Sequence, residues 1–296
     1  MNYEAFKEAL VKETGRQAGE SYQVSLQKIT KNNGISRDAV SICRKDRKVA
    51  PVIYLESFYE QYRKGSSVVR LAADMLEHYR EMDSTFLEMD TDFFSDYENA
   101  RRHIYCKLVN IGMNREMLKE IPYRPYLDLA VVYYYMTDAA GERDATILIS
   151  RKHLEMWNLS SEELDRQAWD NTLADLTPSL RPMSDILKEY ADVQVGEETD
   201  SCFLPMYVLT NTKKTFGSIC IRYPGVLEQG AEKLGDDFYI LPSSVHECIL
   251  VPAGRTVSSE ILKEMVTDIN HTQVEPQEVL ANQVYLYSRL LNKIVF

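Results

Sequence analysis

The stretch from Met206 to Asn270 limits the fold most, because it alternates short strand-like and helix-like segments with a turn signal at nearly every joint. MYVLTN is predicted to be a strand that turns through NTKKTFG and returns as a second strand, SICIRY. After the break at Pro224-Gly225, a short helix is predicted for VLEQGAEKLG. DFYILPSS and HECILVP form the next predicted pair of strands, and SSEILKEMVTDINH has the apolar spacing of an amphipathic helix. The segment therefore predicts an α+β fold.

A hairpin followed by a helix is predicted three times, starting at Leu127, Met206 and Asp237. In the first of these units, LDLAVVYYYM is apolar on both faces, which favours a central strand. ATILIS is predicted to run back beside it, and a later helix begins with the capping box of Ser160 and Glu163. We expect one mainly antiparallel sheet built from these units, with helices packed on it. An insert or linker, PSLRPMSDILKEYADVQVGEETDS, is expected between the first unit and the other two, and true internal duplication stays open.

The N-terminal region has a separate pattern of one helix, three strands and two helices. The tripeptide NNG at residues 32–34 offers the positive φ angles of a tight reversal between the first two strands. We expect a smaller N-terminal α+β subdomain over residues 1–82 and a C-terminal α+β sheet domain over residues 101–296. Residues 83–100 mix acidic and aromatic side chains, and they are expected to form a linker or a docking segment.

Charge and cysteine content restrict the classes of partner and the compartment. The chain of 296 residues has a formal net charge of −11, so neither nucleic acid nor an anionic membrane is expected as a partner. The basic cluster at residues 44–48 is explained by a solvated turn. No apolar run approaches the roughly 20 residues of a membrane span, and the charged start MNYEAFKEALVKE differs from a signal peptide. Five widely spaced cysteines fit reduced thiols, so we expect a cytoplasmic protein.

Tyrosine is unusually frequent, with 19 residues against 9 Phe and 2 Trp. A tyrosine buries a large ring and keeps a polar tip, so it suits either the edge of a core or an interaction surface. The core edge is the simpler interpretation, and an interaction surface remains the alternative.

His246 and Cys248 are the best candidates for a catalytic pair, because residues two apart on a strand share a face. A thiol beside an imidazole could act as a nucleophile with its base, and Asn270 or Asn282 could orient the imidazole. Against this, Cys248 lies in the apolar run CILVP, where a buried structural thiol is the simpler interpretation.

Other kinds of site have no support in the sequence. The five histidines are spread out, and residues 90–96 lack the glycine and terminal Glu of a calcium-binding EF-hand loop, so no metal site is expected. The chain contains no glycine-rich phosphate loop and no Gly-x-Ser-x-Gly motif, so no cofactor is expected either.

Several segments taken together resemble a bacterial family. They are MNYEAFKEAL, KITKNNGISRDAVSI, APVIYLESFYEQY, LDLAVVYYYM, MYVLTN, YPGVLEQGAEKLGDDFYILPSSVHE and DINHTQVEPQEVLANQVYLY. Nearly the whole chain is similar to the uncharacterised clostridial (Firmicutes) family catalogued as domain of unknown function 5688. The resemblance implies a bacterial source and a cytoplasmic setting, and it supplies no catalytic residue.

Two functions are compatible with these observations. The first is a protein-binding or regulatory module that acts through a tyrosine-rich sheet face or a sheet edge, and it is favoured by the lack of a catalytic motif. The alternative is an enzyme with an unrecognised active site near His246.

Overall fold

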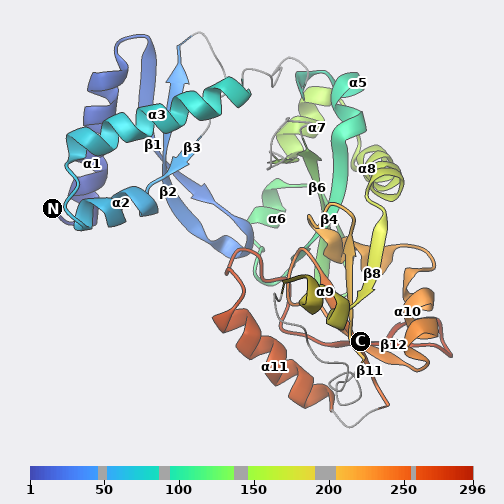
Figure 1. Cartoon of the computed structure of the whole chain (residues 1–296). Coiled ribbons are helices and arrows are strands. Elements are labelled where there is room, and N and C mark those ends of the chain that lie inside the picture. Colours follow the sequence, from blue (N-terminus) through green and yellow to red (C-terminus); the bar gives the residue numbers. More distant parts are fainter. Residues whose placement is uncertain (46–51, 87–93, 137–145, 191–204, 255–257, 296) are drawn as a thin grey trace. The chain divides into compact units, whose positions relative to one another are not determined.

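The computed structural model describes residues 1–45, 52–86, 94–136, 146–190, 205–254 and 258–295. The chain forms two compact units, an N-terminal unit within Met1–Ala100 and a C-terminal unit made of Arg101–Met136 and Thr146–Phe296. Both units combine helices with antiparallel strands, which confirms the predicted α+β class (Figure 1).

The N-terminal unit contains the predicted order of one helix, three strands and two helices. Its strands form an antiparallel sheet in the order β1-β2-β3. At the turn between β1 and β2, Asn33 and Gly34 have φ angles of 61° and 69°, as the NNG tripeptide predicts. The elements are α1 (Tyr3–Ala18), β1 (Tyr22–Thr30), η1 (Asn32–Gly34), β2 (Ser36–Arg44), β3 (Val52–Tyr54), α2 (Glu56–Arg63), α3 (Val68–Phe86) and α5 (Tyr97–Ala100).

The core of the N-terminal unit lies between its sheet and its helices. It is formed by buried apolar side chains of Phe6, Leu10, Val40, Ile42, Ile53, Leu55, Phe58, Leu71, Ala72, Met75, Leu76 and Tyr79. Beside this core, the ammonium of Lys7 lies 2.8 Å from Asp38 Oδ2, and the Lys7 side chain is only 8% exposed. The hydrogen bond from Lys7 lowers the pKa of Asp38, and the same bond raises the pKa of Lys7.

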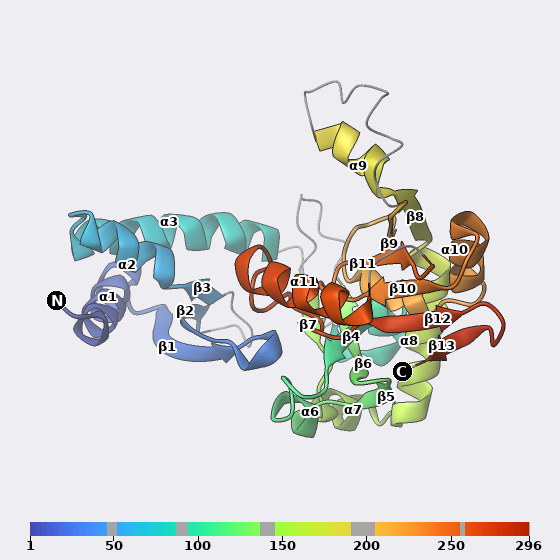
Figure 2. The ribbon, with the colours of Figure 1, turned by 90° about the horizontal axis from the view of Figure 1, so that it is seen from below.

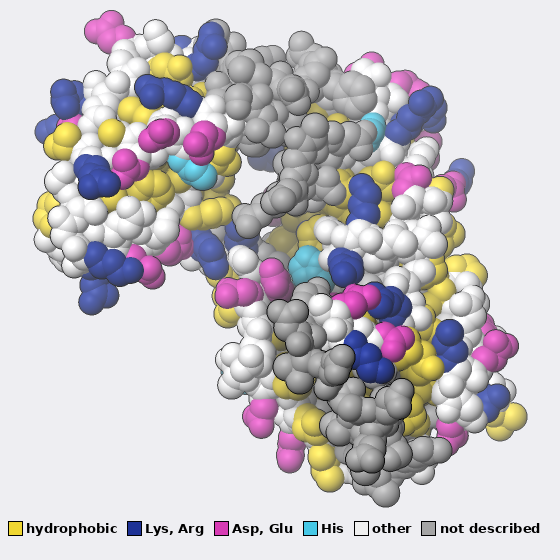
Figure 3. Space-filling view, viewed as in Figure 1, with side chains coloured by type: hydrophobic (Ala, Val, Ile, Leu, Met, Phe, Trp, Pro, Cys, Tyr) yellow, Lys and Arg dark blue, Asp and Glu magenta, His cyan; other side chains and the backbone are white. Residues whose placement is uncertain are grey.

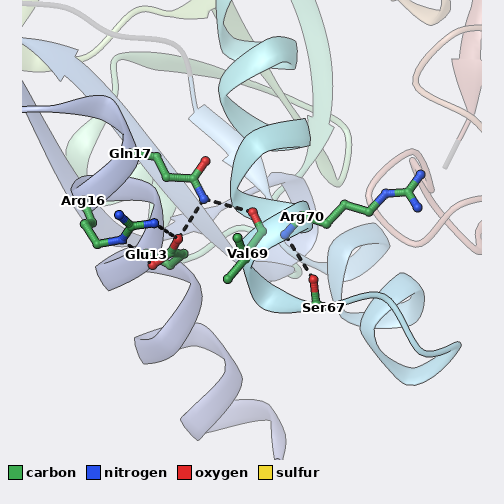
Figure 4. Close-up of polar contacts among 6 residues, drawn as sticks. All are labelled: Glu13, Arg16, Gln17, Ser67, Val69 and Arg70. Carbon is green, nitrogen blue, oxygen red and sulfur yellow. Dashed lines mark hydrogen bonds and ion pairs between the residues drawn. The ribbon is translucent and has the colours of Figure 1, made fainter.

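A polar network joins the end of α1 to the start of α3 (Figure 4). The side-chain amide of Gln17 donates to the Val69 carbonyl at 2.9 Å and to the Glu13 carboxylate at 2.8 Å. Ser67 caps α3, because its hydroxyl oxygen accepts from the Arg70 backbone N–H at 3.3 Å. These contacts fix the register of the two helices at the surface of the unit.

The C-terminal unit contains two antiparallel sheets. A four-stranded sheet is formed by β4, β5, β6 and β7, and a six-stranded sheet has the order β13-β12-β10-β11-β9-β8. The elements are η2 (Arg101–His103), β4 (Ile104–Asn110), α6 (Met117–Glu120), β5 (Tyr123–Tyr126), β6 (Leu129–Met136), β7 (Thr146–Leu148), α7 (Arg151–Trp157), α8 (Ser161–Asp175), β8 (Pro178–Pro182), α9 (Met183–Tyr190), β9 (Tyr207–Asn211), η4 (Gly217–Arg222), α10 (Val226–Leu234), β10 (Phe238–Leu241), β11 (Cys248–Pro252), α11 (Ser259–Thr272), β12 (Tyr285–Ser288) and β13 (Lys293–Val295).

Strand β6 is the centre of the four-stranded sheet, as its apolar sequence predicts. All eight of its residues are buried. β4 pairs with one edge of β6, while β5 and then β7 pair along the other edge. Helix α8 begins at the predicted capping box, in which Ser160 and Glu163 exchange side-chain-to-backbone bonds.

Helices cover both faces of the six-stranded sheet. On one face, Leu262 and Val266 of α11 pack against Leu241 of β10 and Val251 of β11. On the other face, Gly230 of α10 lies close to side chains of β10 and β11. Figure 2 shows α11 running along its side of the sheet, on the opposite side from α10. The predicted hairpin of β10 and β11, followed by the amphipathic helix α11, is therefore confirmed.

Three sequence-based expectations are wrong in this unit. The strands do not form a single sheet, and SICIRY is not a strand, because Gly217–Arg222 forms the 3-10 helix η4. The strand β9 pairs instead with β11 and with β8. The start of the expected insert, PSLRP, is thus the edge strand β8, and its two prolines suit an edge because they lack a backbone donor.

Two other expectations fall partly outside the described residues. The structure does not describe residues 87–93 of the predicted linker or residues 46–48 of the basic cluster. Both assignments therefore stay predictions. Among the described residues, no helix combines the length and the apolar character that crossing a membrane requires.

Replacing Asp38 tests the ion pair with Lys7. Asp38→Asn is expected to lower the free energy of unfolding at neutral pH by about 2 kcal/mol. The mostly buried ammonium loses the more buried of its two carboxylate partners and keeps only the exposed carboxylate of Glu4, at 2.9 Å. The pKa of Asp38 is lowered in the folded state. The contribution of the Asp38 carboxylate to stability is therefore complete above its unfolded-state pKa, about 3.9. It is lost as the pH falls through the folded-state pKa. Urea denaturation between neutral and acidic pH should show the variant and the parent converging below that value.

The control for this measurement is Asp74→Asn. The Arg70 Nε atom lies 3.9 Å from Asp74 Oδ2 on the exposed side of α3, and such a surface pair contributes less than about 0.5 kcal/mol. An Asp38→Asn variant as stable as the parent at neutral pH would contradict the role assigned to the Lys7 pair.

Candidate functional site

His246 lies in the bend before β11, and Cys248 is the first residue of that strand. The alternation of side chains along a strand therefore does not place the two on a common face. The bend is held by its backbone, because the His246 N–H donates to Ser244 Oγ at 3.0 Å and the His246 carbonyl accepts from Thr210 Oγ1 at 2.8 Å.

One nitrogen of the His246 imidazole is hydrogen-bonded, and the other faces a carboxylate. Nδ1 accepts a hydrogen bond from the Phe216 backbone N–H at 3.2 Å, and Nε2 lies 3.9 Å from Glu278 Oε1. The neutral ring consequently carries its proton on Nε2, facing the carboxylate. Its plane is nearly parallel to the Phe216 ring, with centroids 5.4 Å apart. The hydrogen bond at Nδ1 and the stacking on Phe216 favour a structural clamp.

The clamp holds Phe216 in a conformation that bulky residues rarely adopt. Phe216 has a φ of 52°, in the left-handed region. Its ring lies under the ammonium of Lys107, 4.0 Å from the ring centroid, and edge-on to the ring of Tyr134. Stacking on His246 and packing against β4 and β6 thus offset the cost of this backbone conformation.

The thiol of Cys248 is fully buried, and burial raises its pKa. The buried thiols of Cys106 and Cys220 have their pKa values raised to about 12 for the same reason. A cysteine nucleophile must be a thiolate, so this environment favours inert, protonated thiols. The two asparagines also lie together: Asn270 donates from Nδ2 to Asn282 Oδ1 at 2.7 Å.

Gly217 permits the close approach of η4, β9 and the His246 bend. A Cβ atom at this position would lie 2.6 Å from the Asn211 backbone nitrogen and 2.7 Å from the His246 carbonyl oxygen, and closer still to Thr210 Oγ1. No side chain fits there without moving backbone. The neighbouring Ser218 hydroxyl donates to the Val245 carbonyl at 2.7 Å, which ties η4 to the same bend.

Most tyrosines in the sheets of the C-terminal unit are core residues. Buried tyrosines of its strands and of the segment after η4 are Tyr105, Tyr133, Tyr134, Tyr135, Tyr223, Tyr285 and Tyr287. Hydroxyl groups of five of them bond to polar partners inside the unit, as in the bond from Tyr285 to Asp128. Burial makes these sheet faces unsuitable as a docking surface, so an exposed apolar surface has to be sought elsewhere.

Helix α11 carries such a surface. Ile261, Met265 and Ile269, which we call the α11 stripe, are 51%, 50% and 41% exposed. They are four residues apart and therefore follow one side of the helix. The next row around the helix, Leu262 and Val266, is buried against the sheet, and this packing fixes the direction in which the stripe points.

Acidic side chains border the α11 stripe. Glu264 and Asp268 are exposed and lie on the side of the stripe away from the sheet. Among the described residues neither forms an ion pair. Figure 3 shows apolar and acidic side chains next to one another over α11.

Sequence reasoning identified α11 as amphipathic but missed the stripe. The signal was present, because Ile261, Met265 and Ile269 repeat with a spacing of four beside the row of Leu262 and Val266. Two adjacent apolar rows make an apolar arc wider than one sheet face can cover. Within the described residues, no group of three or more His, Cys, Asp or Glu side chains is arranged to hold a metal ion.

Substituting Gly217 tests the close approach at the His246 bend. Gly217→Ala is expected to lower the free energy of unfolding by about 3 kcal/mol or more, because the added methyl group meets backbone atoms that cannot move separately. Gly254→Ala is the matched control, since its added methyl group would meet only the movable end of the Asp236 side chain. Denaturation midpoints that shift equally for the two variants would contradict this account.

Removing the His246 ring tests its role as a clamp. His246→Ala is expected to cost about 1–3 kcal/mol of stability, because the Phe216 N–H loses its acceptor. His271→Ala removes an exposed imidazole of α11 and should change stability by less than about 0.5 kcal/mol. Chemical denaturation measures both. A His246→Ala variant with parental stability and lost biological activity would favour the enzyme alternative instead.

The comparisons with known proteins give a family and no activity. The family model described as "Family of unknown function (DUF5688)" matches residues 3–289. No curated protein and no solved structure matches the chain. Since the match extends over nearly all of the sequence and agrees with the segments from MNYEAFKEAL to DINHTQVEPQEVLANQVYLY, the chain belongs to the DUF5688 family.

Proposed function

We propose that this chain is a protein-binding module of a bacterial cytoplasm, and that the α11 stripe is its docking surface. The partner segment has its own apolar side chains at helical spacing, bordered by Lys or Arg. The exposed stripe of Ile261, Met265 and Ile269 is the observation that supports the proposal. The buried thiols of Cys106, Cys220 and Cys248 form no disulfide, which supports the cytoplasmic setting.

The arrangement of the stripe distinguishes it from scattered surface hydrophobics. Single exposed apolar residues are common on soluble proteins, but three in line on one helix face form a continuous contact surface. Met265 lies in the middle, and its flexible thioether side chain adapts to different partner surfaces. The exposed Leu290 and Leu291 lie side by side at the tip of the β12–β13 hairpin, so they form no comparable row.

Charge determines which partner fits. The unpaired carboxylates of Glu264 and Asp268 would lie at the rim of the interface, where they attract Lys or Arg of a partner. The net charge of −11 adds long-range attraction to a basic segment and repulsion of an acidic one. A second copy of this chain would therefore bind the α11 stripe poorly, because its own acidic side chains would face those of the first copy.

The alternative of an enzyme near His246 gains no support from the geometry. Nδ1 of the imidazole is held by the Phe216 backbone N–H, and the Cys248 thiol is buried. No observation on the described residues favours a reaction there, so the binding function is the one we carry forward.

Site-specific photo-crosslinking tests the docking surface in the cells that produce the protein. We expect p-benzoylphenylalanine at position 265 to crosslink a partner segment that has apolar residues flanked by Lys or Arg. The same group at position 263, on the polar side of α11, should crosslink this partner at least about tenfold less. Ile269→Glu should reduce the crosslink from position 265 by a similar factor, because it places a charge in the apolar contact.

Three results would contradict the proposal. They are no crosslink from position 265, equal crosslinking from positions 263 and 265, and a crosslink to a second copy of this chain. Ile269 is exposed, so Ile269→Glu should alter stability by less than about 0.5 kcal/mol, and denaturation of the variant checks that its fold is kept.

A further inference from the structure

Arg222 has an unusual environment for an arginine. It is the last residue of η4 and is half-buried. Its guanidinium carbon lies 4.7 Å from the ring centroid of Trp169 and 5.2 Å from that of Tyr126. Both rings are half-buried, so solvent reaches the cluster that the three side chains form. We call these three residues the Arg222 cluster.

The backbone next to Arg222 is anchored to the helix that carries Trp169. The hydroxyl of the following residue, Tyr223, donates to the Thr172 and Leu176 carbonyls at the end of α8, at 3.0 and 2.9 Å. The Tyr223 ring also lies edge-on to Trp169, with centroids 5.8 Å apart. The backbone that carries Arg222 is therefore fixed relative to α8.

A neighbouring arginine shows the usual arrangement. Arg124 lies two residues before Tyr126 on β5, and its Nε is 2.6 Å from Asp165 Oδ2. Asp165 lies one helical turn before Trp169 on α8, and its other oxygen accepts from the Tyr133 hydroxyl at 2.7 Å. This carboxylate thus has a bond at each oxygen and compensates the charge of Arg124.

Arg222 has no such partner. Within the part of the chain that the structure describes, it donates no hydrogen bond and forms no ion pair, although a guanidinium carries five N–H donors. Burial raises the pKa of Tyr126 to about 12, so this ring neighbour is neutral at physiological pH. An uncompensated cation is thus kept half-buried in a protein of net charge −11.

We infer that the Arg222 cluster is a binding site for the carboxylate of an organic ligand, with the ligand's apolar part packed on Trp169 and Tyr126. A planar carboxylate matches the guanidinium fork through two parallel hydrogen bonds. A phosphate dianion generally needs more than one cation or a helix N-terminus, and the cluster offers a single positive charge. The site is formed by β5, α8 and η4, so it is independent of the α11 stripe and goes beyond the binding function proposed there.

Nuclear magnetic resonance of the indole N–H of Trp169 tests this inference on the full chain. The chain has two tryptophans, and the variant Trp157→Phe assigns the remaining indole signal to Trp169. We expect benzoate to shift this signal saturably at constant ionic strength, while inorganic phosphate does not. A free acid and a peptide C-terminus present the same group, so tighter binding of N-acetylphenylalanine than of benzoate would identify a peptide C-terminus as the source.

Variants separate binding at Arg222 from a general charge effect. Arg222→Gln should weaken benzoate binding at least about tenfold, and Arg222→Lys should also weaken it, because lysine lacks the planar fork. The control Arg151→Gln removes the same charge from an exposed position on α7 and should leave the affinity unchanged. The remaining resonances of each variant report whether its fold is intact.

The inference is overturned by any of three outcomes. Benzoate produces no saturable shift, phosphate binds as tightly as benzoate, or a folded Arg222→Lys variant binds benzoate as tightly as the parent. The last outcome would leave Arg222 as a packing residue on its two aromatic neighbours.

Discussion

Complete burial of β6 is the constraint on which the C-terminal unit depends. A strand with no residue facing water needs hydrogen-bond partners along both edges and apolar cover on both faces. β4 pairs with one edge, and β5 and β7 share the other. The hydroxyl of Tyr133 is carried inward with the strand, and it bonds to Asp165 of α8. The position of α8 is therefore linked to the burial of β6.

The position of α8 in turn determines which charges remain for function. Asp165 is used by Tyr133 and Arg124, and the end of α8 accepts from the Tyr223 hydroxyl. Arg222 is thereby placed beside two aromatic rings, with no carboxylate partner among the described residues. The α11 stripe arises in a similar way, because the sheet covers one apolar row of the helix and leaves the adjacent row exposed. Both proposals therefore concern side chains whose apolar surface or charge is left uncovered in the folded unit.

Local sequence patterns predicted most helices, strands and turns well, but they predicted poorly which strands pair with each other. The apolar run of β6, the capping box at Ser160 and the turn at residues 32–34 all follow from interactions within a few residues. SICIRY has a composition that suits a strand, yet it forms η4 because Gly217 packs against backbone from β9 and from the His246 bend. PSLRP gives only a weak strand signal, and β8 exists because β9 offers it an edge.

The candidate site was only partly accessible from sequence. His246 was singled out, but the hydrogen bond from Phe216 to its Nδ1 and the Glu278 carboxylate near its Nε2 involve residues far away in the chain. The spacing of the α11 stripe was visible in the sequence, whereas its exposure was not. The absence of a carboxylate beside Arg222, within the described residues, likewise depends on the fold.

The sequence by itself determined the α+β class, the buried centre of one sheet, the helix caps and the membership of the DUF5688 family. These features depend on backbone preferences and on apolar periodicity, which act over short stretches of chain. Only the tertiary structure decided how the strands of the C-terminal unit divide between two sheets, that the His246 ring stacks on Phe216, and which apolar and charged side chains stay uncovered. Those outcomes depend on contacts between residues distant in sequence, and such contacts form only when the whole unit packs.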